Sequence, residues 1–412
     1  MDKDRINKLK ECLEKLETDY QIQYDVDGLP EDVREWPDEV DIDEISICFP
    51  DDYDSEGYNV DELFFYIAEL DSLKEIDKTT SRTKHIRQTI IDSKYKDWET
   101  FRDKLCRYSF KNDNYTVRVV RNPFLIGATN SKNGNYEEKF GIGCSNPYLA
   151  LELKYDDDNL LTDKEENELL EQITFYLTRV QGTAIYISEV VDVYNVQDDY
   201  YDGDNEEEDD DEEEIIVKVS DLIGYGPILR LYRQAKMSED KEIKFLQFYK
   251  IIEYISPLVA KLNAYDKLNK RLDLLASSSR DHQYLDSIFE VTRKYDMDVK
   301  DDYLAESVVK NCVDVIPLQE FIPKRIRKNK MSNKPIMQES DMKDEQLSSL
   351  QKLIARIIYA TRNSIVHAKS NYESNGYEME GDELDDGNVM MEKIALSIIQ
   401  WNERQPDNCK MH

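Results

Sequence analysis

Three side chains that could act together on a phosphate group lie within six positions of one another: Arg362, Asn363 and His367. Histidine exchanges a proton near neutral pH, so it can serve as a general base. Arginine stays charged and presents a planar fork of donors, so it can stabilise negative charge on phosphoryl oxygens. The asparagine amide can hold a phosphate oxygen or fix the imidazole tautomer. A lone surface histidine usually has no catalytic role, so this reading depends on how the three residues are positioned.

The apolar residues around these positions predict a long amphipathic helix over residues 347–368. At about 100° per residue, its core face contains Leu347, Leu350, Ile354, Ile357, Ile358, Ile365 and Ala368. Its polar face contains Lys352, Arg356, Asn363, His367 and Ser370. Arg362 lies about 140° from His367 and borders the core face. Arg362 and His367 can therefore meet only through the long arginine side chain, a distorted helix end, or a second copy of the helix.

The stretch from Arg362 to His367 resembles the R-N-x-x-x-H form of the motif of HEPN domains. Upstream, Phe248–Tyr254 is similar to an earlier helix of that family, in which Glu253 matches an acidic residue. The residues after the motif, a polar loop and a final apolar helix also resemble the family. The resemblance covers about residues 220–405, and it implies an all-helical bundle there.

Many HEPN domains are ribonucleases of toxin–antitoxin and antiviral defence systems. The resemblance implies a metal-independent endoribonuclease without a cofactor, in which the 2′-hydroxyl attacks the adjacent phosphorus and leaves a 2′,3′-cyclic phosphate. His367 would take the proton, and Arg362 and Asn363 would hold the phosphate. Glu253, a carboxylate in an apolar helix, is a good partner for Arg362. The family usually builds one site from two domains, which implies a homodimer or a larger even-numbered oligomer, acting in antiphage defence by abortive infection.

Two other functions stay open at this point. HEPN-like domains can be non-catalytic modules that bind RNA or form dimers. The acidic N-terminal half could instead be the functional part and bind a basic protein partner. The presence of Arg362, Asn363 and His367 together favours the nuclease.

A basic run precedes the predicted motif helix. Residues 323–334 contain six basic side chains and no acidic one. This charge density suits an RNA backbone, but a solvated loop would have the same composition. The predicted RNA-binding residues are Lys324, Arg325, Arg327, Lys328, Lys330 and, from the motif helix, Arg356.

The 412 residues predict an α+β protein of two domains. We expect a mixed α/β domain over 1–196, an acidic disordered linker over 197–216 and the all-α HEPN-like bundle over 217–412. Residues 1–216 hold 24 basic and 57 acidic residues (net −33), whereas 217–412 hold 30 and 31 (net −1). The acidity of the whole chain therefore does not exclude an RNA partner for the C-terminal half.

The linker is the most acidic part of the chain. Thirteen of the 17 residues in 198–214 are Asp or Glu. Like charges at this density repel one another and bury nothing, so we expect a disordered segment. It is interpreted as a solvated spacer, with the alternative that it competes with RNA for a basic surface.

The N-terminal domain is interpreted as a sensor or partner-binding module for a phage-derived or protein trigger. Apolar spacing predicts a helix from Ile6 to Leu16, and Thr162 to Glu165 has the spacing of a capping box that begins a helix over 161–180. Strands are expected at 45–49, 115–120 and 148–155. Residues 152–154 match the E-x-K element of metal-dependent DNA nucleases, but no convincing acidic partner precedes them.

The cysteines and the lengths of the apolar runs indicate the cellular location that we expect. The six cysteines are scattered without a CxxC pair, so we expect neither a disulfide framework nor a zinc site, and a cytoplasmic location. The longest apolar runs are far shorter than the ~18–20 residues that cross a bilayer. The charged N-terminus is unlike a signal peptide, and no membrane partner is expected.

Overall fold

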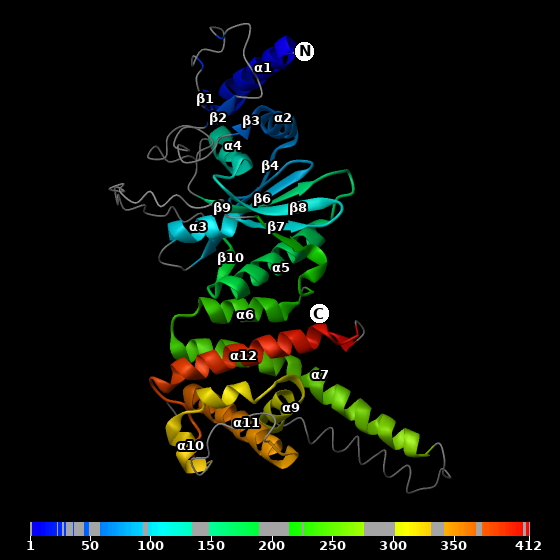
Figure 1. Cartoon of the computed structure of the whole chain (residues 1–412), viewed down its shortest axis with the longest axis vertical. Helices are drawn as coiled ribbons and strands as arrows, with labels where there is room; N and C mark the ends of the chain where they lie inside the picture. The colour runs from blue at the N-terminus through cyan, green and yellow to red at the C-terminus, as the bar shows by residue number, and fades with distance from the viewer. Residues whose placement is uncertain are drawn as a thin grey trace. The chain divides into compact units, whose positions relative to one another are not determined.

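The computed structural model divides the chain into two compact units, Met1–Leu222 (unit 1) and Ile223–His412 (unit 2) (Figure 1). It is an α+β structure: unit 1 combines helices with a mixed sheet, and the described part of unit 2 is helical. The residues that the structure describes are 2–22, 24–26, 29, 36, 45–48, 58–93, 98–133, 148–188, 214–224, 226–275, 301–330, 342–367, 373–406 and 409–411.

The centre of unit 1 is an eight-stranded sheet in the order β11-β7-β8-β9-β6-β5-β4, with β10 also paired to β6. Its pairs are antiparallel except β11 with β7, which is parallel. The predicted strands at 115–120 and 148–155 are confirmed as β8 and β9. The strand bounds are β4 Lys74–Asp77, β5 Thr80–Arg82, β6 Ile86–Ser93, β7 Tyr108–Lys111, β8 Tyr115–Arg121, β9 Leu149–Tyr155, β10 Ile185–Ile187 and β11 Ile215–Lys218.

Helices and a small second sheet complete unit 1. The second sheet contains β1 Asp25–Val26, β2 Ser46–Cys48 and β3 Tyr58–Asn59, and β2 confirms the strand expected at 45–49. The helices are α1 Asp2–Tyr20, α2 Val60–Glu69, η3 Leu70–Ser72, α3 Trp98–Cys106, α4 Phe124–Asn133 and α5 Asp163–Gln181. One apolar core joins α1, α2 and α4, and another joins the sheet with α3 and α5.

Local sequence signals explain two of these helices. In α1 the predicted apolar face is buried, with Ile6, Leu9, Leu13 and Leu16 at most 4% exposed. In α5 the predicted capping box is present, because the Thr162 hydroxyl accepts from the backbone N–H of Glu165 and the Glu165 carboxylate accepts from that of Thr162. Gly182 ends α5 with φ of +72°, a conformation that glycine adopts without strain.

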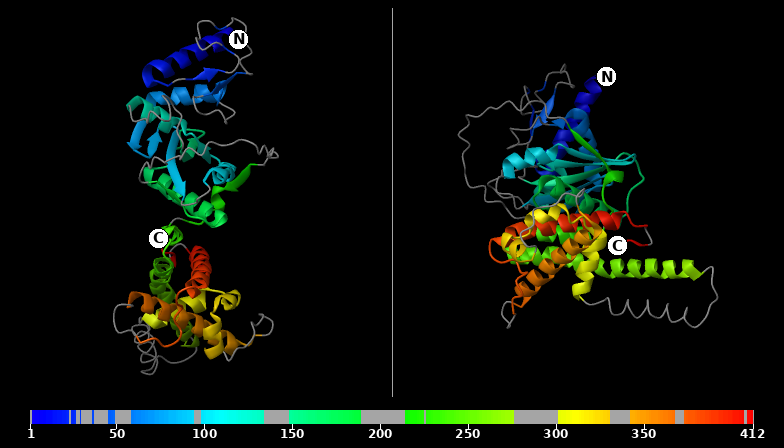
Figure 2. Two further views of the ribbon diagram at one scale, coloured as in Figure 1. Left: turned by 90° about the vertical axis from the view of Figure 1, so that its left-hand side faces the viewer. Right: turned by 60° about the horizontal axis from the view of Figure 1, so that its bottom comes forward.

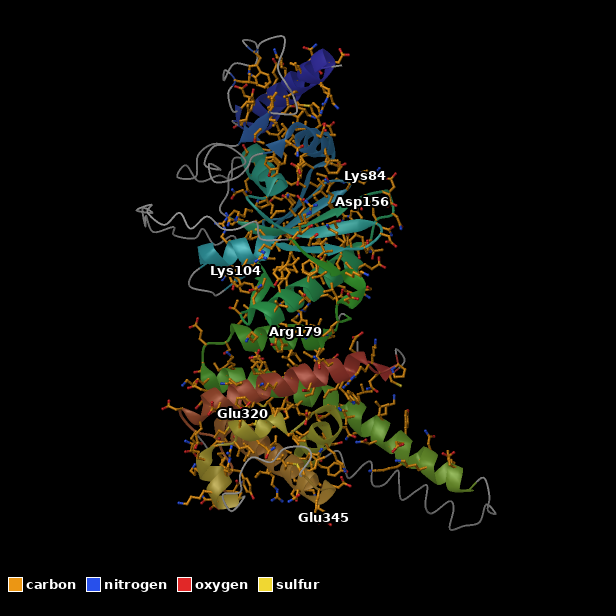
Figure 3. The ribbon with its side chains drawn as sticks, in the orientation of Figure 1. Lys84, Lys104, Asp156, Arg179, Glu320 and Glu345 are labelled. Carbon is orange, nitrogen blue, oxygen red and sulfur yellow. The ribbon has the colours of Figure 1, made fainter. Side chains whose placement is uncertain are left out.

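Unit 2 is built from helices around a common core. In the part of unit 2 that the structure describes, α12 packs along α7, and α9 lies against both α7 and α11 (Figures 1 and 2). Charged side chains such as Glu320 and Glu345 are exposed at its surface (Figure 3). Unit 1 ends with η5 Val219–Asp221. The helices of unit 2 are α6 Pro227–Met237, α7 Lys241–Leu275, α9 Asp301–Cys312, η6 Pro317–Phe321, α10 Lys324–Lys330, α11 Asp344–Val366 and α12 Glu383–Glu403.

The long helix α7 has an apolar stripe on its buried side. Phe245, Phe248, Ile252 and Ile255 are at most 1% exposed, and the helix continues through Pro257. Residues 324–330 of the basic run form the short helix α10. Ile326 is fully buried and attaches this short helix to the core.

The division between the units falls after Leu222. Residues 215–218 form β11, whose pairing with β7 places them in the sheet of unit 1. Most of the expected linker, through residue 213, lies outside the described residues. Within the described residues, no helix is long and apolar enough to cross a membrane.

Candidate active site

Helix α11 positions the residues with catalytic potential at its C-terminal end. It spans Asp344–Val366, close to the prediction, and its buried face includes Leu350, Ile354 and Ile358. His367 ends the helix: its backbone N–H donates to the carbonyl of Asn363 at 2.9 Å, and its φ of −105° and ψ of 14° leave the helical region. The motif therefore occupies the last turn of a helix that is anchored by its apolar face.

Arg362 is fixed by three neighbours. Its Nη2 donates to Glu253 Oε1 at 3.3 Å, and its Nη1 donates to Asn363 Oδ1 at 3.0 Å. Its guanidinium carbon lies 5.5 Å from the ring centroid of Tyr249, within the range of a cation–π contact. The expected Glu253–Arg362 ion pair is thus present, and it joins α7 to α11. Tyr249, which the sequence did not single out as a site residue, lies one helical turn before Glu253 and supports the same guanidinium.

The contact with Arg362 also determines how the Asn363 amide is oriented. Guanidinium groups only donate hydrogen bonds, so the atom that faces Arg362 must be the amide oxygen. The NH₂ group of Asn363 is then directed away from Arg362. His367, one turn later on the same side of α11, is exposed. The last turn therefore presents an amide donor and an imidazole on one side and a fixed guanidinium towards α7.

Two of the predicted RNA-binding arginines are engaged in holding α10 in place. Arg325 pairs with Glu383 at 3.0 Å and donates to the carbonyl of Glu378 at 2.6 Å, and the ion pair raises the pKa of Arg325. Arg327 donates to the carbonyl of Gln319 at 2.5 Å. These contacts connect α10 to α12, to η6 and to the segment before α12. Both arginines therefore have structural contacts in addition to any role in binding.

The other predicted basic residues are exposed. Lys324 and Lys328 lie on the outer side of α10. Lys330 and Arg356 come from different helices and meet at Tyr377, in the segment between α11 and α12: the Lys330 ammonium is 4.1 Å and the Arg356 guanidinium carbon 5.9 Å from the Tyr377 ring centroid. Sequence spacing gives no signal for Tyr377, because it lies in a non-helical segment.

In unit 1, both charged residues of the E-x-K element have partners within the protein. Glu152 is buried and accepts hydrogen bonds from Tyr66 Oη at 2.7 Å and Gln88 Nε2 at 2.6 Å. Burial, together with the Glu152 charge, raises the pKa of Tyr66 well above its ordinary value. Lys154 lies over the ring of Phe65. Among the described residues there is no cluster of three His, Cys, Asp or Glu side chains that could hold a metal ion.

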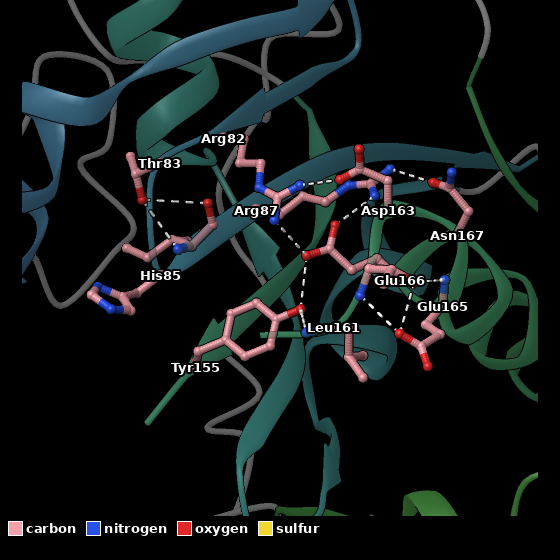
Figure 4. A network of polar contacts seen from close by, with 12 residues as sticks. Arg82, Thr83, His85, Arg87, Tyr155, Leu161, Asp163, Glu165, Glu166 and Asn167 are labelled. Carbon is pink, nitrogen blue, oxygen red and sulfur yellow. Dashed lines mark hydrogen bonds and ion pairs between the residues drawn. The ribbon is translucent and has the colours of Figure 1, made fainter. Parts of the chain in front are cut away.

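A second buried carboxylate, Glu166, lies at the first turn of α5 (Figure 4). It is fully buried and contacts Arg82 at 3.0 Å, Arg87 at 2.9 Å and the Tyr155 hydroxyl at 2.7 Å. Burial and the hydrogen bond to Glu166 raise the pKa of Tyr155. Because both carboxylate oxygens are fully paired within unit 1, Glu166 is a stabilising group that links α5 to the sheet.

His85 connects three segments of unit 1 through two carboxylates. Its Nε2 lies 2.9 Å from Asp158 and its Nδ1 lies 2.8 Å from Glu69. The hydrogen bonds to Asp158 and Glu69 raise the pKa of His85. Lys84, and then His85, lower the pKa of Asp158 to about 2.

We expect the stabilisation from His85 to depend on pH. Its folded pKa is raised above the unfolded value of about 6.5, so the contribution is complete below about pH 6.5 and is lost as pH rises through the folded pKa. His85→Gln should therefore destabilise unit 1 at about pH 6 and have a smaller effect at about pH 8.5. Urea unfolding at both pH values measures this difference. Lys84→Met is the matched control, because it removes an Asp158 contact that does not titrate in this range; equal pH dependence of the two variants would contradict the prediction.

Known proteins give no independent guide to this chain. Comparisons with protein-family models, with curated proteins and with solved structures found no match. The function is therefore inferred from the residues themselves. The C-terminal end of α11 carries three groups with complementary phosphate chemistry, of which Arg362 and Asn363 contact each other.

Proposed function

We propose that unit 2 is a metal-independent endoribonuclease whose active site is the last turn of α11. The observation that carries this proposal is the Arg362 guanidinium, held by Glu253 and Asn363, at the same helix end as the exposed His367. The HEPN resemblance assigns catalytic roles to the same four residues. Arg362 and Glu253 lie 109 positions apart in sequence, so their contact joins the two helices from which the resemblance draws its residues.

The chemistry divides between two groups. His367 takes the proton from a ribose 2′-hydroxyl, whose oxygen attacks the adjacent phosphorus. The bond from phosphorus to the 5′-oxygen breaks, and this oxygen takes a proton from water while His367 releases its proton to solvent, which leaves a 2′,3′-cyclic phosphate and a 5′-hydroxyl. Arg362 stabilises the negative charge that develops on the phosphoryl oxygens, and the Asn363 NH₂ donates to one of them. Glu253 and Tyr249 position the guanidinium, and no step needs a metal ion.

The site is proposed to need two chains. Arg362 is directed towards α7, whereas His367 lies about 140° further round α11. Within one chain, a phosphate would have to contact two side chains that leave the same helix in different directions. Two α11 ends that face each other would bring the imidazole of one chain near the guanidinium of its partner. We therefore propose a homodimer or a larger even-numbered oligomer.

Unit 1 is proposed to control this activity. In the biology that the resemblance suggests, a phage-derived or protein trigger binds unit 1, and RNA cleavage by unit 2 then arrests the infected cell by abortive infection. Unit 1 has its own core and its own paired carboxylates at Glu152 and Glu166. This supports a partner-binding module more than a second nuclease, because both carboxylates are already satisfied by protein donors.

The test is the cleavage of labelled RNA by the full chain in excess EDTA, with the new ends identified. We expect cleavage to persist without metal and to leave 2′,3′-cyclic phosphate and 5′-hydroxyl ends. Light scattering on the same sample should show a dimer or a larger even-numbered assembly. Cleavage that stops with EDTA would contradict the mechanism, and a fully active monomer would contradict the two-chain site. RNA binding without cleavage would favour the non-catalytic alternative.

A further inference from the structure

In unit 2, an aromatic ring lies within cation–π distance of two cations, one of them about three helical turns before His367 on α11. Tyr377 is half-buried, and the exposed side chains of Lys330 and Arg356 approach its ring from α10 and α11. Three separate segments of the chain therefore converge here. Lysine and arginine at a protein surface bind phosphate, and an aromatic ring can stack on a nucleobase.

The segment that carries Tyr377 is held rigidly by a buried carboxylate. Glu378 is fully buried and accepts hydrogen bonds from Ser374 Oγ at 2.8 Å and from the backbone N–H groups of Asn375 and Gly376 at 2.9 and 2.8 Å. Gly376 has φ of +81°, which allows the chain to turn around this carboxylate. The ring of the next residue, Tyr377, is thus presented at low cost in conformational entropy on binding.

A further hydrogen bond attaches the segment to α11 itself. The backbone N–H of Met379 donates to the hydroxyl of Thr361 at 2.9 Å, and Thr361 is fully buried. The position of Tyr377 is therefore set relative to the helix that carries Arg362 and His367. The nearby Glu383 is paired with Arg325, which leaves Glu373, Glu380 and Asp382 as exposed acids of this segment.

Arg356 and His367 lie on the same face of α11. They are eleven positions apart, which corresponds to about 20° around the helix and about 16 Å along it. The half-buried Tyr359 and the proposed phosphate ligand Asn363 lie between them on this face. A strand that follows the face would pass from the ring of Tyr377 to the end of α11, over a distance of about five stacked nucleotides.

We infer that Lys330, Arg356 and Tyr377 form a binding site for single-stranded RNA, in which the two cations contact phosphates and the Tyr377 ring stacks on an unpaired base. The inference rests on the proposed function and specifies its substrate class. Bases in a duplex are stacked on one another and offer no free face, whereas unpaired bases stack on protein aromatics. The ring therefore selects single strands, which the two positive charges alone would not do.

The experiment measures RNA affinity in the full chain carrying His367→Ala, so that the probe stays intact. The probes are a short fluorescent RNA and the same strand annealed to its complement. Tyr377→Leu should weaken binding of the single strand by about 5- to 150-fold, the range for loss of one base–aromatic stack. It should leave duplex binding within about twofold, and Tyr377→Phe, which retains the ring, should bind as the parent does.

A second variant tests the site without changing the segment that carries Tyr377. Replacing Lys330 and Arg356 with methionine should weaken both probes and reduce the dependence of binding on salt concentration, because two phosphate contacts are lost. Unchanged single-strand affinity of folded Tyr377→Leu would overturn the inference, as would equal losses for both probes. The proposed nuclease function can fail separately: the strand preference would then persist while the chain that retains His367 cleaves no RNA.

Discussion

Replacing His367 with alanine is expected to slow RNA cleavage by about 10²–10⁴-fold, the usual cost of losing a general base. Arg362→Ala should cause a loss of similar size, because the charge on the phosphoryl oxygens would lack its fixed cation. His367 is exposed, so its removal should leave the fold intact. The rate of RNA cleavage by the two purified variants, with circular dichroism as a check of folding, measures these effects.

Val366→Ala is the matched control for this prediction. Val366 is adjacent to His367, is 48% exposed and has no polar group, so the variant should cleave RNA at the parent rate. Arg362→Lys is informative as well, since lysine keeps the charge but lacks the planar fork that contacts Glu253 and Asn363 together. A folded His367→Ala protein that cleaves at the parent rate would show that the nuclease proposal is wrong.

The helical part of this architecture could be predicted from sequence because its signals are local. The apolar face of α11, the stripe of α7 and the capping box of α5 each depend on residues a few positions apart. The ion pair between Glu253 and Arg362 was also expected, since Glu253 lies in an apolar helix and Arg362 borders the core face. Glu253 is 50% exposed, so its burial is not what requires the pair. The helical pattern thus predicted a contact between two of the four proposed catalytic residues, Glu253 and Arg362.

Contacts between distant segments could not be predicted in this way. The pairing of β11 with β7 joins segments about a hundred residues apart, and no local pattern encodes it. The basic run gave the right charge, but the sequence did not show that Arg325 and Arg327 would bind backbone carbonyls beside α10. Tyr377 was missed for the same reason: it meets Lys330 of α10 and Arg356 of α11 only after folding.

The largest effect on stability is expected from Glu166 in unit 1. Its carboxylate lies between Arg82 and Arg87 and accepts from Tyr155, with none of its side chain exposed (Figure 4). Glu166→Leu would leave two partly buried guanidinium groups and a hydroxyl without this acceptor. Breaking a buried ion pair by removing one partner costs about 3–5 kcal/mol. Arg82 keeps Asp163 and Arg87 keeps Asn167, so we expect a cost of about 3 kcal/mol, near the lower end.

Amide hydrogen exchange in β9 measures this cost in the full chain, because β9 is central to the sheet of unit 1 and reports its cooperative opening. A loss of about 3 kcal/mol corresponds to exchange about 150-fold faster. Glu168→Gln, two positions later on α5, is the control: its partner Lys164 is 84% exposed and 3.6 Å away, and such surface pairs contribute little. Exchange in Glu166→Leu that is as slow as in Glu168→Gln would mean that the arginines find other acceptors. Faster exchange confined to Glu166→Leu would identify this buried carboxylate as the group that holds α5 on the sheet.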